Sequence, residues 1–401
     1  MQKFEKSFTQ QEAIPEKAIQ CAEKVLRSGR LHRYNSDVGG EPTETELLEL
    51  EFAHYVGSRF CLSCASGGYA LHIALLSVGL KLGDKVLCNA FTLAPVPGAI
   101  TNAGGVPVLV ETTDDYTIDL DDLAQKAQQE DVKFLMLSHM RGHLADMNKL
   151  MTICEANHVT VIEDCAHTMG AKWDGVHSGR FGKVACYSTQ TYKHLNSGEG
   201  GLLTTDDETV MAKAIIYSGS YMLYERHLAA PRAEAFEGID TATPNFSGRM
   251  DNLRAAILRP QLQDIDEQCA QWNRRYALLE DALCDIEGMR FPRRPPQEAF
   301  VGSSIQFNLV NQSADFIREF VVRCEALGVV LKWFGDAKPK GYTSQYQSWA
   351  YLDTSAELPN TDRVLATMLD MRIPLTFDES DCTQIAEIIR YVWEDMNQRA
   401  C

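Results

Sequence analysis

The chain has 401 residues, of which 45% are hydrophobic and 23% are charged. This composition is typical of a globular protein with one large domain or two domains. The 38 lysines and arginines stand against 55 aspartates and glutamates, a net charge of −17 that excludes nucleic acid as a favoured partner.

Localisation is predicted from the N-terminus and the cysteines. Residues 1–20 are polar and lack the apolar core of a signal peptide, and no apolar run has membrane-spanning length. Twelve scattered cysteines are typical of reduced thiols, and the single CxxC at Cys61 and Cys64 lies in an apolar run that reads as a strand. We therefore expect a cytoplasmic protein without a membrane partner.

The first half of the chain predicts an α/β fold. A helix is expected over residues 15–28, ending at Gly29, and a second begins at Thr43, where Glu46 has capping-box spacing. Short apolar runs then predict buried strands at residues 59–64, 84–90, 106–111, 133–138, 159–164 and 183–188. Because helical patterns separate most of these runs, we expect a mainly parallel central sheet covered on both faces.

After about residue 250 the regular alternation of predicted strands and helices ends. One long helix is predicted over residues 249–285, followed by a proline-rich segment and a mixture of strand and helix patterns. We therefore predict a large α/β domain over residues 1–250. Residues 251–401 would hold the connecting helix and a small C-terminal α+β domain.

Candidate site residues follow the predicted strands, because ligands of parallel sheets gather at the carboxyl ends of the strands. They are Ser66, Gly67 and Gly68, then Asp164, then Ser188 and Lys193. Each signal alone has an ordinary explanation as a turn, a cap or a solvated charge. No GxGxxG or GxxxxGK[ST] motif is present, so a Rossmann oxidoreductase and a Walker phosphate loop are not supported.

Taken together, these residues match the needs of pyridoxal phosphate. Its phosphate needs N–H and hydroxyl donors, and helix N-termini supply them. Its ring nitrogen needs a carboxylate, and its aldehyde needs a lysine amine for a Schiff base.

Three long motifs carry a resemblance to a known family. They are "GDKVLCNAFTLAPVPGAITNAGGVPVLVE", "VIEDCAHTMGA" and "YSTQTYKHLNSGEGG", in that order along the chain. The sequence resembles the DegT/DnrJ/EryC1/StrS aminotransferases, a branch of the fold-type I pyridoxal-phosphate enzymes. The resemblance covers about residues 12–395 and implies a fold-type I architecture.

The resemblance assigns roles to individual residues. Lys193 matches the Schiff-base lysine, Asp164 the partner of the pyridine nitrogen, and His167 the side chain that lies against the ring. The phosphate contacts would come from Ser66, Gly67, Gly68 and Ser188, with Ser247 reaching the partner subunit's phosphate. This chain departs from the family pattern at Gly68, where a threonine is missing, at Leu93, where an aromatic residue often stacks on the ring, and at Ser247, where asparagine is usual.

Cations near the strand ends are candidates for substrate binding. Arg33 and Tyr34 lie in the segment "RLHRYN", and Arg141 lies in "SHMRGH" at another strand end. We expect some of these cations to bind a carboxylate, phosphate or pyrophosphate of a substrate. Ordinary ion pairing on loop surfaces is an equally good explanation at this stage.

The implied activity is transamination. Glutamate or glutamine would donate an amino group through the Lys193 Schiff base to a keto group of a sugar, cyclitol or related metabolite. The resemblance also implies a homodimer with shared active sites. Two alternatives remain: a dehydratase of the same family, in which a histidine such as the adjacent His194 would replace the lysine, and a non-catalytic regulatory homologue.

Overall fold

A seven-stranded sheet forms the centre of the protein. The computed structural model describes residues 1–34, 41–340, 345–352 and 357–400. The strand order in this large sheet is β1-β9-β8-β5-β4-β2-β3. Its strands are β1 (Phe60–Cys64), β2 (Lys85–Asn89), β3 (Val106–Val110), β4 (Val132–Ser138), β5 (Thr160–Asp164), β8 (Val184–Ser188) and β9 (Gly201–Thr205). Only β9 runs against its neighbours, so the carboxyl ends of the other six strands meet at one edge.

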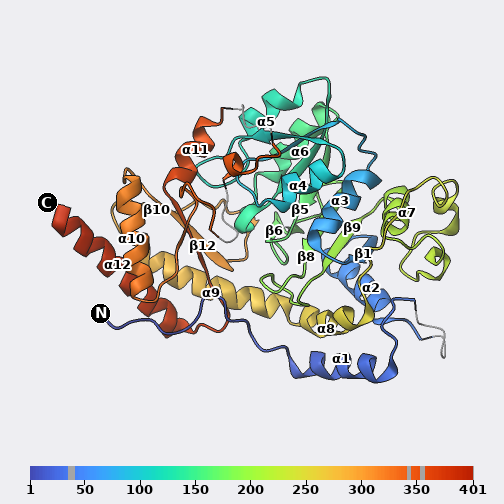
Figure 1. Ribbon diagram of the computed structural model, residues 1–401, viewed down its shortest axis with the longest axis horizontal. Coiled ribbons are helices and arrows are strands. Elements are labelled where there is room, and N and C mark those ends of the chain that lie inside the picture. The colour runs from blue at the N-terminus through green and yellow to red at the C-terminus, as the bar shows by residue number, and fades with distance from the viewer. Residues whose placement is uncertain (35–40, 341–344, 353–356, 401) are drawn as a thin grey trace.

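Helices cover both faces of this sheet (Figure 1). One face packs against α2 (Glu44–Val56), α5 (Leu120–Ala127), α6 (Met147–Ala156) and α8 (Asn252–Gln263). The other packs against α3 (Gly67–Ser77), α4 (Pro95–Asn102) and α7 (Glu208–Tyr217). In β4, Leu135 and Leu137 belong to the first core and Phe134 and Met136 to the second, because successive strand residues point to opposite faces. Both faces are buried, which explains why the strands read as continuous apolar runs.

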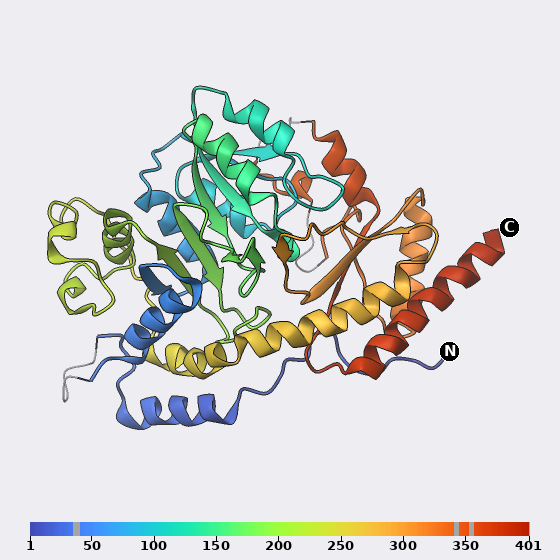
Figure 2. The ribbon, with the colours of Figure 1, turned by 180° about the vertical axis from the view of Figure 1, so that it is seen from behind.

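A four-stranded antiparallel sheet forms a second core. Its order is β10-β12-β14-β13, from β10 (Met289–Arg290), β12 (Ser304–Leu309), β13 (Lys332–Trp333) and β14 (Met368–Arg372). The helices α10 (Ala314–Ala326), α12 (Glu379–Ala400) and α9 (Ile265–Leu283) pack around this small sheet (Figure 2). The N-terminal residues Phe4 and Phe8 join the same core and pack against Phe377, just before α12 begins.

The remaining elements are short. A three-stranded sheet joins β11 (Glu298–Ala299) to β6 (Lys172–Trp173) and β7 (Val176–His177), which ties the second half of the chain to the first. The other helices are α1 (Glu16–Ser28) and α11 (Pro359–Ala366), with 3-10 turns at Met140–Gly142, Tyr224–Arg226, Ala233–Phe236 and Tyr346–Ser348. Within the described ranges, no helix combines the length and apolar character that crossing a bilayer needs.

The predicted α/β fold and mainly parallel sheet are confirmed, with two local differences. The helix expected over residues 249–285 is two helices that meet at Asp264. Pro260 lies in the last turn before this break and has no N–H to donate, which weakens the helix there. The strand β9 was not predicted, because "GLLTT" is short and begins with glycine. The domain division at residue 250 stays a prediction.

The two N-terminal helix signals are confirmed in detail. Gly29 ends α1 in the left-handed conformation that glycine adopts easily. At the start of α2, the Thr43 side chain accepts from the Glu46 N–H while the Glu46 carboxylate accepts from the Thr43 N–H. This reciprocal capping box fixes where the chain enters α2.

Candidate active site

A cavity of about 410 Å³ opens at the carboxyl edge of the large sheet. Side chains following five of its strands line the cavity: Ser66, Leu93, Ser138, Asp164, Ser188 and Lys193. The small sheet closes the opposite wall with Ser304, Lys332 and Arg372. The two sheets therefore enclose the candidate site between them.

One end of the cavity is the start of α3. Ser66 caps this helix by accepting from the Tyr69 N–H, and the helix begins at Gly67. A Cβ at Gly67 would lie 2.8 Å from the Cβ of Ser188, so glycine is needed for the two turns to approach each other. The N–H groups of a first helical turn and the Ser188 hydroxyl suit an anion. The structure thus brings together Ser66, Gly67, Gly68 and Ser188, as the sequence analysis expected.

Asp164 lies at the end of β5, between this helix start and the small sheet. Its carboxylate accepts from the Ala166 N–H at 3.1 Å and from the Ser138 hydroxyl at 3.0 Å. The Thr92 hydroxyl donates to Ser138 at 2.8 Å and fixes the orientation of that serine. Burial raises the pKa of Asp164, while the positive charge of Lys193 and these hydrogen bonds act against the increase.

Lys193 faces the cavity from the loop that follows β8. The loop is closed by Thr189, whose N–H donates to the carbonyl of Gly200 and whose carbonyl accepts from Ser197. The Lys193 Nζ lies 2.8 Å from Nε2 of His167. Burial lowers the pKa of Lys193 to about 7, with a further contribution from Arg141, although the Asp164 carboxylate partly offsets it. A lysine with this pKa presents a neutral, nucleophilic amine near neutral pH.

His167 and His194 are both neutral but have different surroundings. Burial and the nearby cation Lys193 hold the pKa of His167 well below its usual range, so Nε2 can accept from Lys193. Burial lowers the pKa of His194 to about 3, and its Nε2 is bound to the Ser303 hydroxyl at 3.0 Å. His194 is therefore held against Trp272, and Lys193 is the residue that pairs with His167.

A cation-rich wall faces these residues from the other side. Arg141 forms an ion pair of 2.8 Å with Asp370, which is fully buried on β14. Arg372, two residues further along β14, lies with its guanidinium carbon 4.2 Å from the centre of the Tyr192 ring. Lys332 on β13 completes this wall. The sequence predicted Arg141 in the site, but Lys332 and Arg372 carried no signal.

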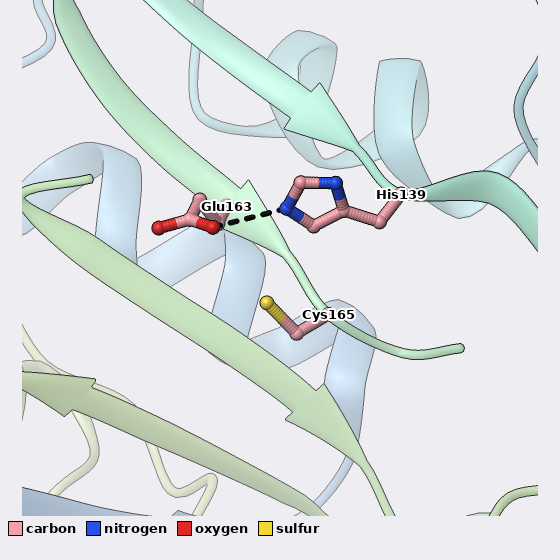
Figure 3. A group of neighbouring side chains, drawn as sticks. All are labelled: His139, Glu163 and Cys165. Carbon is pink, nitrogen blue, oxygen red and sulfur yellow. Dashed lines mark hydrogen bonds and ion pairs between the residues drawn. The ribbon is translucent and has the colours of Figure 1, made fainter. Parts of the chain in front are cut away.

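Figure 3 shows three buried side chains behind the site: His139, Glu163 and Cys165. The Glu163 carboxylate accepts from His139 Nε2 at 3.0 Å and from the N–H groups of Gly179, Phe181 and Gly182. Burial would raise the pKa of Glu163, but these hydrogen bonds outweigh it and the pKa is lowered. Burial also keeps the pKa of Cys165 well above its usual value, so the thiol is a poor metal ligand. We interpret the group as a structural support for the end of β5.

Two predicted substrate residues are not brought to the cavity. The Arg33 guanidinium is fully buried against Glu49, at 2.8 and 2.9 Å from its two oxygens. The Tyr34 hydroxyl contacts His227 at 3.2 Å in the same closed cluster. Local sequence could not distinguish this core ion pair from a substrate clamp, because Glu49 and His227 come from distant elements.

Two further candidates are placed differently from the rest. Leu93 lines the cavity, whereas the nearby Phe91 turns away and packs against Phe334 at a ring distance of 5.1 Å. Ser247 is exposed and does not line the cavity of its own chain. Its proposed contact with a partner subunit's phosphate stays a prediction.

Two hydroxyl groups that hold Asp164 in place were not predicted from the sequence: Thr92 donates to Ser138, and Ser138 donates to Asp164. Ser138 and Thr92 each follow a predicted strand, so the rule that selected Asp164 could have selected them. They were missed because serine and threonine are common at strand ends.

The fold of this chain is also found in solved structures. A crystal structure of 3-amino-5-hydroxybenzoic acid synthase is similar over 97% of this chain and 99% of that one, with a TM-score of 0.83 at 23% identity. This chain therefore shares the fold of that protein, and the α/β architecture expected from the sequence is confirmed.

The family follows from the sequence comparison. The profile of the DegT/DnrJ/EryC1/StrS aminotransferase family matches residues 13–390, and the chain belongs to that family. GDP-perosamine synthase of Caulobacter vibrioides is 32% identical over 60% of this chain, although the match spans only 62% of that protein. L-glutamine:2-deoxy-scyllo-inosose aminotransferase of Streptoalloteichus tenebrarius is 30% identical over 72% of this chain and 71% of its own length.

Proposed function

We propose that the protein is a pyridoxal-phosphate-dependent aminotransferase in which Lys193 carries the cofactor. The observation that carries this proposal is the placement of the Lys193 amine, 2.8 Å from His167 and in a cavity that Asp164 and the start of α3 also line. The pKa of about 7 gives Lys193 the reactivity this role requires.

The residues present fit the cofactor. The start of α3 and the Ser188 hydroxyl would hold the phosphate, where a Cβ at Gly67 would close the space. Asp164 would hold the ring nitrogen, since its carboxylate is kept in place by Ser138 and Ala166. When bound, pyridoxal phosphate supplies an electron-withdrawing ring that stabilises negative charge at the substrate carbon.

Lys193 would also carry a proton. Its free Nζ amine would take a proton from the donor's Cα and later give one back. A pKa near 7 suits both directions, because the amine is neither permanently protonated nor too weak a base. His167 Nε2 accepts from the same Nζ and keeps it directed into the cavity.

The proposed substrates are a glutamate or glutamine donor and a keto group of a sugar, cyclitol or related metabolite. The support comes from the relatives named above, one a glutamine:inosose aminotransferase and the other a GDP-perosamine synthase. The dehydratase alternative has less support, because His194 is bound to Ser303 and Lys193 occupies the position opposite His167.

We further propose a homodimer that works in the cytoplasm. Large apolar side chains are exposed around the segment before Ser247, among them Tyr221, Met222, Leu228 and Phe246. A second copy of the chain would bury them and bring Ser247 near the partner's phosphate cradle, the set of Ser66, Gly67, Gly68 and Ser188. The eleven cysteines of the described residues are all free thiols, which suits a reducing compartment.

The absorption spectrum of the purified protein tests this function. We expect a yellow band with bound pyridoxal phosphate that bleaches on addition of L-glutamate or L-glutamine and is absent from Lys193→Ala. A wild-type protein that takes up no cofactor even at excess would contradict the proposal and leave the non-catalytic alternative in its place.

A further inference from the structure

We infer that Arg141, Arg372 and Lys332 form a subsite that binds a carboxylate of the substrate, and of the amino donor in particular. The inference rests on the proposed function, and it goes beyond it by assigning the recognition of the donor to named residues. Two of these residues, Lys332 and Arg372, come from the small sheet and had no role in the sequence analysis.

Arg141 and the phosphate-binding residues lie at different places along the cavity. In the large sheet, β5 lies between β8 and β4. The phosphate cradle uses the ends of β1 and β8, Asp164 ends β5, and Arg141 follows β4. The cations therefore lie at the opposite end from the cradle, and the reacting groups lie between them. A cofactor phosphate and a substrate anion would not compete for the same donors.

Arg141 is held rigidly, with part of its guanidinium unused. Its φ of 58° is unusual for a residue with a side chain, and Gly142 follows with a φ of 91°. The side chain is about nine-tenths buried, and one amine pairs with Asp370 at 2.8 Å. Its Nε has no hydrogen-bond partner among the described residues. A buried donor without a partner is costly, so a ligand that accepts from it is favoured.

Asp370 is itself held in place by a buried neighbour. Gln306 donates to Asp370 Oδ1 at 2.7 Å, and His143 Nε2 donates to the Gln306 carbonyl at 2.8 Å. Both residues are buried. These contacts fix the orientation of Asp370 and, through the ion pair, that of Arg141. The ion pair also shows that the Arg141 guanidinium can bind a carboxylate.

The wall carries three cations, Arg141, Arg372 and Lys332. The buried Asp370 pairs with Arg141 and also attracts the other two, and Glu12 attracts Arg372. Burial and the charge of Arg141 lower the pKa of Arg372, the expected sign for cations placed together without enough anions. The acids Glu12 and Glu199 also line the cavity, but both are exposed, and Glu12 accepts from the Thr376 N–H.

A carboxylate is the anion that the proposed reaction always supplies. Glutamate and glutamine both carry an α-carboxylate on the carbon whose amine reacts at Lys193. Arg141 and Arg372 are close enough to Lys193 to lower its pKa. A carboxylate bound between these arginines would keep the donor's Cα beside the lysine amine.

The test measures binding without catalysis. Glutarate has two carboxylates and no amine, so it can bind but cannot react. We would titrate glutarate and inorganic phosphate calorimetrically into the full-length protein, with and without pyridoxal phosphate. We expect glutarate to bind wild-type protein and to bind Arg372→Gln about tenfold more weakly.

Two further variants keep the test interpretable. Arg141→Gln combined with Asp370→Asn removes the ion pair as a unit, so no unpaired buried charge is left, and should also weaken glutarate binding. Arg318→Gln is the matched control, because Arg318 also lies against an aromatic ring, that of Trp333 at 5.6 Å, but outside the cavity. It should bind glutarate as wild type does.

Two results would overturn the inference. One is that wild type and Arg372→Gln bind glutarate with the same affinity, or that neither of them binds it. The other is a phosphate affinity that depends on Arg372 while glutarate affinity does not. A yellow cofactor band with unchanged glutarate binding would reject only the subsite, whereas Arg372-dependent glutarate binding without any cofactor band would reject only the proposed function.

Discussion

Two buried arginine–carboxylate pairs have opposite uses in this protein. Arg33 and Glu49 form a closed cluster with Tyr34 and His227, in which both side chains of the pair have no exposure. Arg141 and Asp370 belong to an open cluster with Lys193 and Arg372, on the wall of the cavity. The sequence predicted both Arg33 and Arg141 as substrate-binding candidates for the same reason, because both are cations in predicted loops of an acidic chain.

The difference lies in how completely each carboxylate is surrounded. Glu49 accepts from Arg33, from the Ser63 N–H and hydroxyl, and pairs with His227, so the closed cluster has little capacity for a ligand. The Nε of each arginine has no hydrogen-bond partner among the described residues, but of the two only Arg141 lines the cavity. The comparison teaches that a buried ion pair indicates function only when donors remain on a side that a ligand can reach.

The largest expected effect is the loss of activity on replacing Lys193 in the open cluster, without a loss of stability. Lys193→Ala should reduce transamination by more than about a thousandfold, since both the covalent link and the proton transfer are lost. Its unfolding temperature should stay the same or rise, because a desolvated amine is removed. Steady-state kinetics and thermal unfolding measure both, with Lys149→Ala, 76% exposed at its side chain, as the control. A large loss of stability with activity retained would reverse the assignment.

The closed cluster should show the opposite pattern. Glu49→Gln leaves the Arg33 charge buried without its counter-ion, which we expect to lower the free energy of unfolding by about 3–5 kcal/mol. Activity per folded molecule should stay close to wild type, because Glu49 does not line the cavity. Urea unfolding followed by activity at low denaturant gives both quantities. A stability change within about 1 kcal/mol would show that the cluster contributes little.

The open cluster should also be visible in pH dependence. Only the neutral Lys193 amine can capture pyridoxal phosphate, and its pKa of about 7 places the midpoint of the capture rate there. The rate should fall about tenfold for each pH unit below that midpoint. Asp164→Asn removes the negative charge that raises this pKa and should move the midpoint to lower pH. Stopped-flow absorbance measures the rate, and a midpoint near 10 would contradict the assigned environment of Lys193.

The smallest effect concerns acid stability of the closed cluster. The charge of Arg33, with His227 and hydrogen bonds, outweighs burial and lowers the pKa of Glu49 from 4.5 to about 2. A depressed acid pKa stabilises the fold above the unfolded value and loses that contribution as pH falls towards the folded value. The stability gap between wild type and Glu49→Gln should therefore be full above about pH 4.5 and shrink towards pH 2. A gap that grows in acid would contradict the sign of this shift.

Local sequence patterns predict most of the large sheet and the residues expected to hold the cofactor. Apolar runs located six strands of the large sheet, and capping residues located α1 and α2. Ser66, Asp164, Ser188 and Lys193 could be predicted because parallel strands all deliver their carboxyl ends to the same edge. Local patterns contain that information, since strand period and strand direction are set along the chain itself.

The pairing of cations with carboxylates depends on how distant parts of the chain pack together. Arg33 and Glu49 are 16 positions apart, while Arg141 meets Asp370 across 229 positions, from 141 to 370, and across two sheets. Lys332 and Arg372 reach the cavity only because the small sheet packs over the edge of the large one. No local pattern encodes such encounters, because the partner of a charge depends on how separate elements dock. Lys332 and Arg372 on the cation-rich wall were therefore the part of the site that the sequence could not predict.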